Sequence, residues 1–344
     1  MTTPAFAPIL SAVQSNCHLS DARHAQDLTL CNYLLAMREY YRWEHDLPPG
    51  TPPPRADVAR WIAEREALWE TLGEADWARV PLAAGEADPF DVDAVNAELL
   101  PAGYLYGAGL GRFGKPHFFL ARLASRGLRD GVEVLEAGCE FVRDLDAAPA
   151  ALQGGTIVLR REAFASWLWL TAETWESRAS EGALATALAA YGFADHRARA
   201  LERMAEGERE TLILHELGEL AAGRLLGEAW DRLLAGPGDR RLEITARAVR
   251  DLLADTLVTL PTLLERDAVA SLHFWFATFS GLRRELFPRL ASARDAWVAG
   301  GGTQPLREAV ESGRAHWIRV SRDMVADPQA ARRLSLEPCA ITLA

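Results

Sequence analysis

The chain has 344 residues, of which 49% are hydrophobic and 25% are charged, the composition of an ordinary globular protein with ample length for a core. The formal net charge of −11 argues against general nucleic-acid binding, and no apolar run approaches the roughly 20 residues that a membrane span needs. Because the first residues lack the features of a signal peptide, we expect a cytoplasmic protein with no membrane partner.

Lysine is nearly absent, since Lys115 is the only lysine among the 37 basic residues. We attribute this to a coding bias toward arginine and not to nucleic-acid binding. The four cysteines, Cys17, Cys31, Cys139 and Cys339, show no paired metal-ligand spacing, so neither a disulfide scaffold nor a cysteine zinc ribbon is expected.

The first informative stretch is residues 16–44, NCHLSDARHAQDLTLCNYLLAMREYYRWE. Asp27 is a suitable N-cap, which predicts a helix from Leu28 to about Glu44. The residues before it, which include Cys17, are expected to form a short polar loop. A proline-rich segment ends the helix.

In this helix Arg38, Glu39 and Arg42 lie among aromatic residues. Buried arginines need carboxylates or an anionic ligand, and the carboxylates of a later helix, residues 208–226, are candidate partners. An internal ion-pair network is the alternative. A third possibility is a metal-free enzyme in which Arg38 and Arg42 hold an anionic metabolite.

Residues 107–114, GAGLGRFG, contain the spelling G-x-G-x-x-G of the dinucleotide fingerprint. That spelling has meaning only between a strand and a helix, and no convincing strand precedes it. We therefore expect a flexible loop, followed by a helix that starts near Pro116. Such a loop can cover a pocket, with Lys115 and His117 at its edge.

From residue 132 to residue 161 the hydrophobic period changes to that of short strands, which predicts a small antiparallel β element. Helices are expected on both sides of it. The predicted fold is mainly α, a bundle-like core of several helices with this β insertion. The predicted divisions are residues 1–130, 131–161 and 162–344, or one continuous domain.

The chain is organised around residues 208–226, ERETLILHELGELAAGRLL, where apolar residues surround the helical wheel as in a buried helix. His215 and Glu219 are four residues apart and share one face. The spacing resembles the His-Glu-x-x-His helix of zinc hydrolases, but the second histidine is missing and no third ligand motif follows. It also differs from the Glu-x-x-His pairs of di-iron bundles, so a structural polar cluster remains an alternative.

Later helices offer further ligands. Asp251 and Asp255 are four residues apart on a helix expected from residue 242 to residue 264, with a kink near Pro261. An exposed face with an ion pair between Arg247 and Asp251 is the alternative. His273 lies in an apolar helix, where a core role competes with metal binding.

The segments SDARHAQDLTLCNYLLAMREYYRWE and LHELGE, residues 20–44 and 214–219, resemble segments of a bacterial family of unknown function. The resemblance implies no activity, cofactor or catalytic residue.

The leading functional hypothesis is a metal-dependent helical enzyme acting on a small molecule, a non-haem iron or manganese oxidoreductase, with zinc left open. The catalytic candidates are Glu216, as a group that orients a metal ligand or as a general base, with Arg38 and Arg42. The metal-ligand candidates are His215, Glu219, Glu39, Asp251, Asp255 and His273. The alternative is a non-catalytic helical binding or scaffold protein with buried ion pairs. The oligomeric state does not follow from the sequence.

Overall fold

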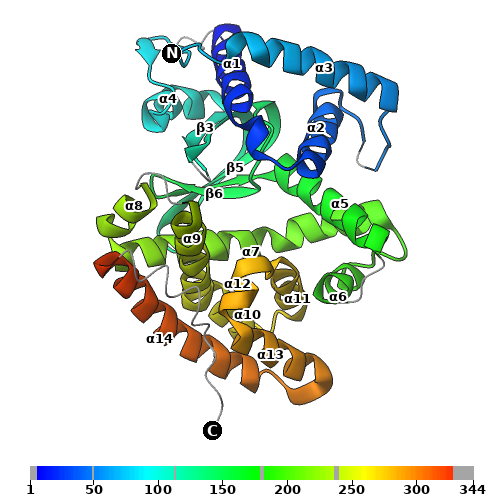
Figure 1. The fold of residues 1–344 in the computed structure, drawn as a ribbon, viewed down its shortest axis with the longest axis vertical. Helices are drawn as coiled ribbons and strands as arrows, with labels where there is room; N and C mark the ends of the chain where they lie inside the picture. Colours follow the sequence, from blue (N-terminus) through cyan, green and yellow to red (C-terminus); the bar gives the residue numbers. More distant parts are fainter. Residues whose placement is uncertain (1–5, 49, 112–113, 179–181, 236–239, 328–344) are drawn as a thin grey trace. The chain divides into compact units, whose positions relative to one another are not determined.

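A computed structural model of the chain describes residues 6–48, 50–111, 114–178, 182–235 and 240–327 (Figure 1). The chain divides into two compact units, an N-terminal unit up to Glu173 and a C-terminal unit from Thr174. The described part of each unit has hydrophobic clusters of its own. Helices dominate, so the predicted mainly α fold is confirmed.

The N-terminal unit combines helices with two sheets. Its helices are α1 (Phe6–His24), α2 (Leu30–Glu44), α3 (Arg55–Leu72), α4 (Val92–Leu99) and α5 (Arg161–Arg178), the last of which contains the boundary between the units. The larger sheet has five strands in the order β3-β4-β5-β7-β6. Their bounds are β3 (Tyr104–Leu110), β4 (Pro116–Arg129), β5 (Val132–Arg143), β6 (Ala150–Gln153) and β7 (Thr156–Arg160). Strands β1 (Val80–Leu82) and β2 (Gly85–Ala87) form a small hairpin.

The β structure is larger than predicted. The pairing of β5 with β7 is parallel and the other pairings are antiparallel, so the sheet is mixed and not a small antiparallel insertion. The glycine-rich stretch is strand β3, and Pro116 begins strand β4 instead of a helix. A Cβ atom on Gly107 would lie 2.0 Å from the ring of Phe119 on β4, so this glycine makes room for an aromatic side chain.

The dinucleotide fingerprint requires a strand followed by a helix, whereas the next element after β3 is strand β4, so this stretch lacks the context of that motif. Residues 112 and 113 of that motif lie outside the described residues.

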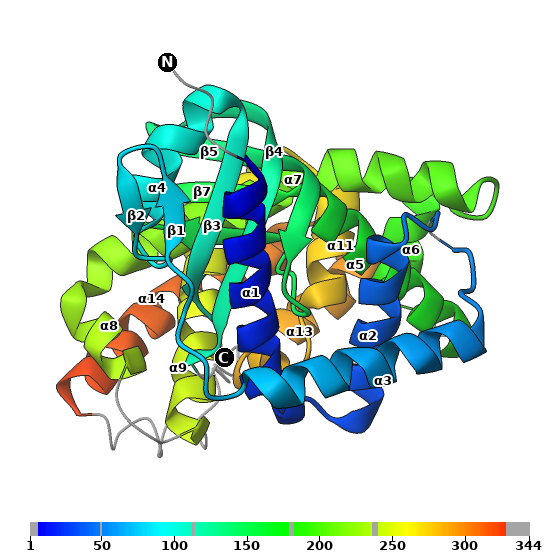
Figure 2. The same ribbon diagram turned by 90° about the horizontal axis from the view of Figure 1, so that it is seen from above.

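Helix α1 runs along one face of the five-stranded sheet (Figure 2). Ile9, Val13 and Cys17 of α1 share a hydrophobic cluster with Tyr106 of β3 and Phe118 of β4. The predicted polar loop before residue 28 is therefore wrong, because these apolar residues recur at helical spacing and cover the sheet. Helix α2 begins at Leu30 and its N-cap is Thr29, not Asp27.

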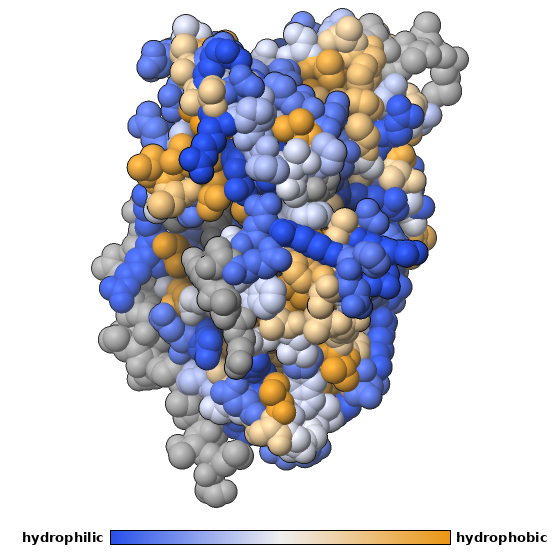
Figure 3. Space-filling model, turned by 90° about the vertical axis from the view of Figure 1, so that its right-hand side faces the viewer, coloured by the Kyte–Doolittle hydropathy of each residue, from blue (hydrophilic) through white to orange (hydrophobic). Residues whose placement is uncertain are grey.

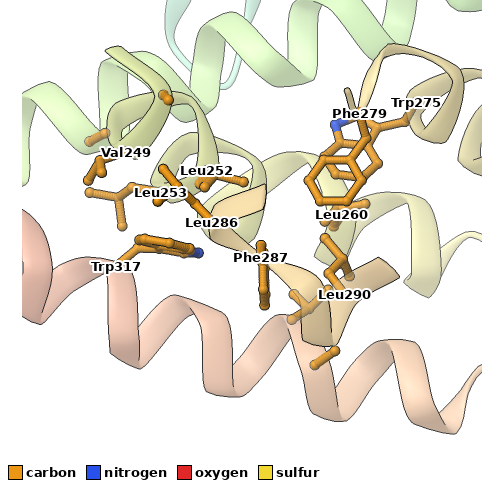
Figure 4. Close-up of a cluster of buried hydrophobic side chains, with 14 of the residues drawn as sticks. Val249, Leu252, Leu253, Leu260, Trp275, Phe279, Leu286, Phe287, Leu290 and Trp317 are labelled. Atoms are coloured by element: carbon orange, nitrogen blue, oxygen red, sulfur yellow. The ribbon is translucent and has the colours of Figure 1, made fainter. Parts of the chain in front are cut away.

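The described residues of the C-terminal unit form helices joined by short turns and contain no strand. Its helices are α6 (Ala183–Ala190), α7 (Arg197–Leu226), α8 (Glu228–Ala235), α9 (Arg240–Ala254), α10 (Leu260–Glu265), α11 (Val269–Thr278), α12 (Gly281–Leu286), α13 (Pro288–Ala296) and α14 (Gln304–Ala326), with π-helical turns at Asp255–Thr259 and Trp297–Gly301. Figure 4 shows its core, where the rings of Phe287 and Trp317 form a T-shaped pair with centroids 5.6 Å apart.

The surface carries hydrophobic side chains among many hydrophilic ones (Figure 3). Exposed examples come from different elements and include Leu30 of α2, Leu128 of β4 and Val298 of the second π-helical turn. In the described ranges no helix has the length and apolar character needed to span a bilayer. Cys17, Cys31 and Cys139 are free thiols.

Candidate metal centre

Helix α7 carries the central histidine against the end of α9. The two helices approach closely at Gly218, where an added Cβ atom would lie 2.5 Å from the carbonyl oxygen of Ala254. Only glycine fits this contact without moving the backbone. The HELGE segment of α7 therefore lies directly beside the residues that follow Ala254.

Those residues form the π-helical turn Asp255–Thr259, in which the N–H of Leu260 donates to the carbonyl oxygen of Asp255. Pro261 follows, and proline can neither donate a hydrogen bond nor tolerate the usual position of the carbonyl four residues earlier. The wider turn is consistent with that restriction. The predicted kink near Pro261 is thus a π-helical turn that holds the buried Asp255 opposite α7.

His215 lies between two carboxylates. Its Nδ1 atom is 2.9 Å from Oδ1 of Asp255, and its Nε2 atom is 3.7 Å from Oε1 of Glu219 one turn along α7. One donor atom each from His215, Glu219 and Asp251 lies within 4.8 Å of the other two. The structure thus brings together four of the predicted ligands, with Asp255 on the opposite side of the imidazole from Glu219.

Two arginines neutralise part of the negative charge of these carboxylates. Arg250 Nη2 donates to Glu219 Oε1 at 2.6 Å and lies 3.9 Å from Asp251 Oδ1. Arg283 of α12 donates to Oδ2 of Asp255 at 3.3 Å. The sequence analysis gave no role to either arginine. Neither contact had a signal in the spacing, because each joins residues of different helices.

The charged groups of this cluster shift each other's pKa values. Burial by itself lowers the pKa of His215, but the carboxylates of Asp255 and Glu219 outweigh it and raise that pKa to about 10. Burial raises the pKa of Asp255, and the opposing effects of His215 and Arg283 bring it below its usual value. For Glu216, burial and the nearby Glu219 carboxylate raise the pKa to about 7.

Solvent reaches one side of the cluster. The side chains of His215, Glu219 and Asp251 are 26%, 14% and 21% exposed, whereas that of Asp255 is 1% exposed. Glu216 is buried. The Nε2 side of the imidazole therefore offers the accessible donor atoms, and the Nδ1 side is anchored in the core.

The other predicted residues have different surroundings. In the N-terminal unit, Glu39 accepts from Arg38 and Arg42, and both arginines also contact Glu173 of α5. This is an internal ion-pair network whose observed carboxylates are Glu39 and Glu173. In the contacts of the described residues, these arginines find their carboxylates on α2 and α5, and none of the predicted partners from residues 208–226 is among them.

The remaining candidates lie in the C-terminal unit. His273 stacks on Trp297 at a ring distance of 4.6 Å and does not belong to the group formed by His215, Glu219 and Asp251. Arg247 donates to Glu243, one turn before it on α9, where we predicted a pair with Asp251. Asp251 instead faces the donor atoms of α7.

Comparison with known proteins gives a family but no activity. Residues 8–160 match the N-terminal domain of a family of unknown function, DUF6866, and residues 165–337 match the C-terminal domain of the same family. No curated protein and no solved structure matches the chain. The resemblance to an uncharacterised family is thereby confirmed. The two matches together span both units, so the chain belongs to DUF6866, a family of unknown function.

Proposed function

We propose that this protein is a metal-dependent enzyme whose C-terminal unit holds a divalent cation with His215, Glu219 and Asp251. The observation that carries the proposal is the convergence of one imidazole nitrogen and two carboxylate oxygens, all within 4.8 Å of one another, on a side that solvent reaches. Three protein ligands leave coordination positions for water or substrate, as catalytic metal sites require.

The surroundings of His215 support a ligand role. Metal-bound histidines commonly donate their second ring N–H to a carboxylate, which fixes the ring and makes the free nitrogen more basic. Asp255 occupies that position at 2.9 Å from Nδ1 and is itself held by Arg283. The cation would take the place of a proton on Nε2.

The donor set bears on the choice of metal. Carboxylates suit manganese, imidazole suits iron and zinc, and thiolates, which favour softer metals, are absent from this group. Within the proposal we favour iron or manganese and an oxidation–reduction reaction on a small molecule. Glu216 keeps its predicted role as a nearby proton-handling group.

A second candidate function is a non-catalytic scaffold in which the same residues form structural ion pairs. The contact of 2.6 Å between Arg250 and Glu219 favours it, because a carboxylate satisfied by arginine needs no cation. This contact does not exclude the metal-dependent function, because the second carboxylate oxygen of Glu219 can bind a metal while Oε1 keeps its arginine.

Elemental analysis separates these functions. Full-length protein purified without an affinity tag is expected to contain close to one iron or manganese per chain, and His215→Ala is expected to lose it. Glu219→Gln, which keeps the shape of the side chain, should also lose most of the metal. Asp255→Asn should retain the ligands but bind about 10–100-fold more weakly, the usual effect of removing a carboxylate behind a metal-bound histidine.

His316→Ala is the matched control, because His316 lies on α14, near Arg319, and is not a member of the group formed by His215, Glu219 and Asp251. Circular dichroism verifies that each variant is folded. Wild-type protein without metal after growth and refolding in iron, manganese or zinc would contradict the proposal and favour the scaffold. Equal metal content in His215→Ala and His316→Ala would place the metal elsewhere.

A further inference from the structure

Arg250 of α9 lies beside two of the three proposed metal ligands. Its Nη2 atom donates to Oε1 of Glu219 at 2.6 Å and lies 3.9 Å from Oδ1 of Asp251. The side chain of Arg250 is 23% exposed, so solvent reaches it as it reaches the two carboxylates. A cation held by these carboxylates would therefore have a partly exposed guanidinium as its immediate neighbour.

The guanidinium of Arg250 uses little of its hydrogen-bonding capacity. It has five N–H groups, and its one hydrogen bond to the described residues is the contact with Glu219. Its Nε atom is buried without a partner among those residues. Its Nη1 atom has no partner there either, and it is not one of the buried atoms. Because Nη1 and Nη2 are bonded to the same carbon, this accessible donor lies within a few ångströms of the carboxylate oxygens.

The balance of charges does not oppose an anion at this position. A divalent cation in place of the proton on Nε2 of His215 would balance the two carboxylate ligands. Beyond Nδ1, Arg283 balances Asp255. The positive charge of Arg250 then gives a sum of +1. Even with Glu216 ionised the sum is zero, so no net negative charge would repel an anionic ligand from the loaded site.

We propose, on the basis of the proposed metal centre, that Arg250 makes the site specific for a small molecule with a carboxylate group. One oxygen of that carboxylate takes an open coordination position of the cation. The other oxygen accepts a charge-assisted hydrogen bond from Nη1 of Arg250, while Nη2 stays with Glu219. A dianionic phosphate would give the site a net negative charge, so the singly charged carboxylate is the better match.

The test uses full-length protein loaded with Mn²⁺ and freed of unbound metal, because water bound to this ion speeds the relaxation of solvent protons. Sodium acetate is titrated at constant ionic strength, and acetamide is the uncharged probe of the same shape. We expect acetate, but not acetamide, to displace the bound water and lower the relaxation rate in a saturable way. Arg250→Gln should weaken acetate binding at least about tenfold, the effect of losing a hydrogen bond between charged groups.

Arg250→Gln should keep its manganese, because none of the proposed metal ligands is changed. Arg247→Gln is the matched control. Arg247 lies one turn earlier on α9, also contacts a glutamate, Glu243, and has a side chain that is likewise 23% exposed. This control should bind acetate as wild type does. Arg250→Lys keeps the charge without the planar fork and should bind acetate more weakly than wild type, which provides a second variant if Arg250→Gln does not fold.

Failure of this proposal differs from failure of the metal centre. Wild-type protein that binds no Mn²⁺ contradicts the metal centre, and the role of Arg250 falls with it. Wild-type protein that holds Mn²⁺, with the metal lost in His215→Ala, but binds acetate no better than acetamide overturns the role of Arg250 alone. Equally tight acetate binding by wild type and a folded Arg250 variant does the same.

Discussion

His18 shows how one buried side chain sets a pH dependence. It lies on α1, is 8% exposed, and its Nε2 atom is 3.0 Å from Nη1 of Arg65. Burial and the positive charge of Arg65 lower its pKa from 6.5 to about 4, against the opposing effect of Glu44. The folded protein therefore holds this histidine neutral at pH values where the unfolded chain protonates it.

This predicts a loss of stability in acid. Between about pH 6.5 and pH 4 the unfolded chain binds more protons at His18, so the free energy of unfolding falls as the pH falls, by at most about 3 kcal/mol from this residue. His18→Gln removes the titration and should flatten that part of the profile. Urea unfolding at several pH values measures it, with His24→Gln as the control. Equal slopes in wild type and His18→Gln would refute the assignment.

The carboxylate partners of the α2 arginines could be predicted from the sequence only in part. Sequence analysis predicted that Arg38 and Arg42 need carboxylates, and the structure supplies Glu39 and Glu173. The requirement follows from the physics of burying a charge. The identity of Glu173 does not, because it is 135 residues away from Arg38 and its approach depends on how α5 packs.

At the scale of elements, the contact between α7 and α9 determines the geometry of the candidate metal centre. The sequence predicted the pair of His215 and Glu219 on one face, because residues four apart on a helix are neighbours. It named Asp255 as a further candidate ligand but not its position at Nδ1 of His215, since that position depends on the close approach at Gly218 and on the π-helical turn. Neither the close helix contact nor the π-helical turn can be predicted from hydrophobic periodicity.

Gly218 can be tested against another glycine of the same helix. Gly218→Ala forces the backbones of α7 and α9 apart and should destabilise the protein by about 1–3 kcal/mol, with weaker metal binding. Gly223→Ala, where an added Cβ meets nothing within 4 Å, should instead stabilise α7 by about 0.5–1 kcal/mol. Chemical unfolding compares the two variants. Equal stability of Gly218→Ala and wild type would argue against the close contact.

The strands were the least predictable elements. Strand β3 reads as a loop because glycines interrupt its apolar pattern, yet Gly107 is required by the packing of Phe119 and Gly111 lies beside His117. Those partners belong to β4, so the reason for each glycine lies in another strand. Helix α1 was missed in a similar way, since its polar residues near Cys17 suggested a loop while its apolar residues cover the sheet.

At the scale of the whole molecule, two units carry two kinds of polar cluster. The N-terminal unit places a lysine, a histidine and two aspartates against its five-stranded sheet. The C-terminal unit places a histidine, three carboxylates and two arginines around the contact of α7 with the end of α9. The boundary between the two DUF6866 matches lies within 13 residues of the boundary between the units, which is after Glu173. Each cluster can thus be studied through residues of one unit.

The most direct test of the central claim is anomalous diffraction from crystals of the full-length protein grown with iron or manganese, measured at the absorption edge of that metal. We predict a peak at about 2.0–2.3 Å from Nε2 of His215 and from carboxylate oxygens of Glu219 and Asp251, with Asp255 still bonded to Nδ1. The absence of a peak there, with Glu219 held only by Arg250, would contradict a metal centre and leave a structural ion-pair cluster.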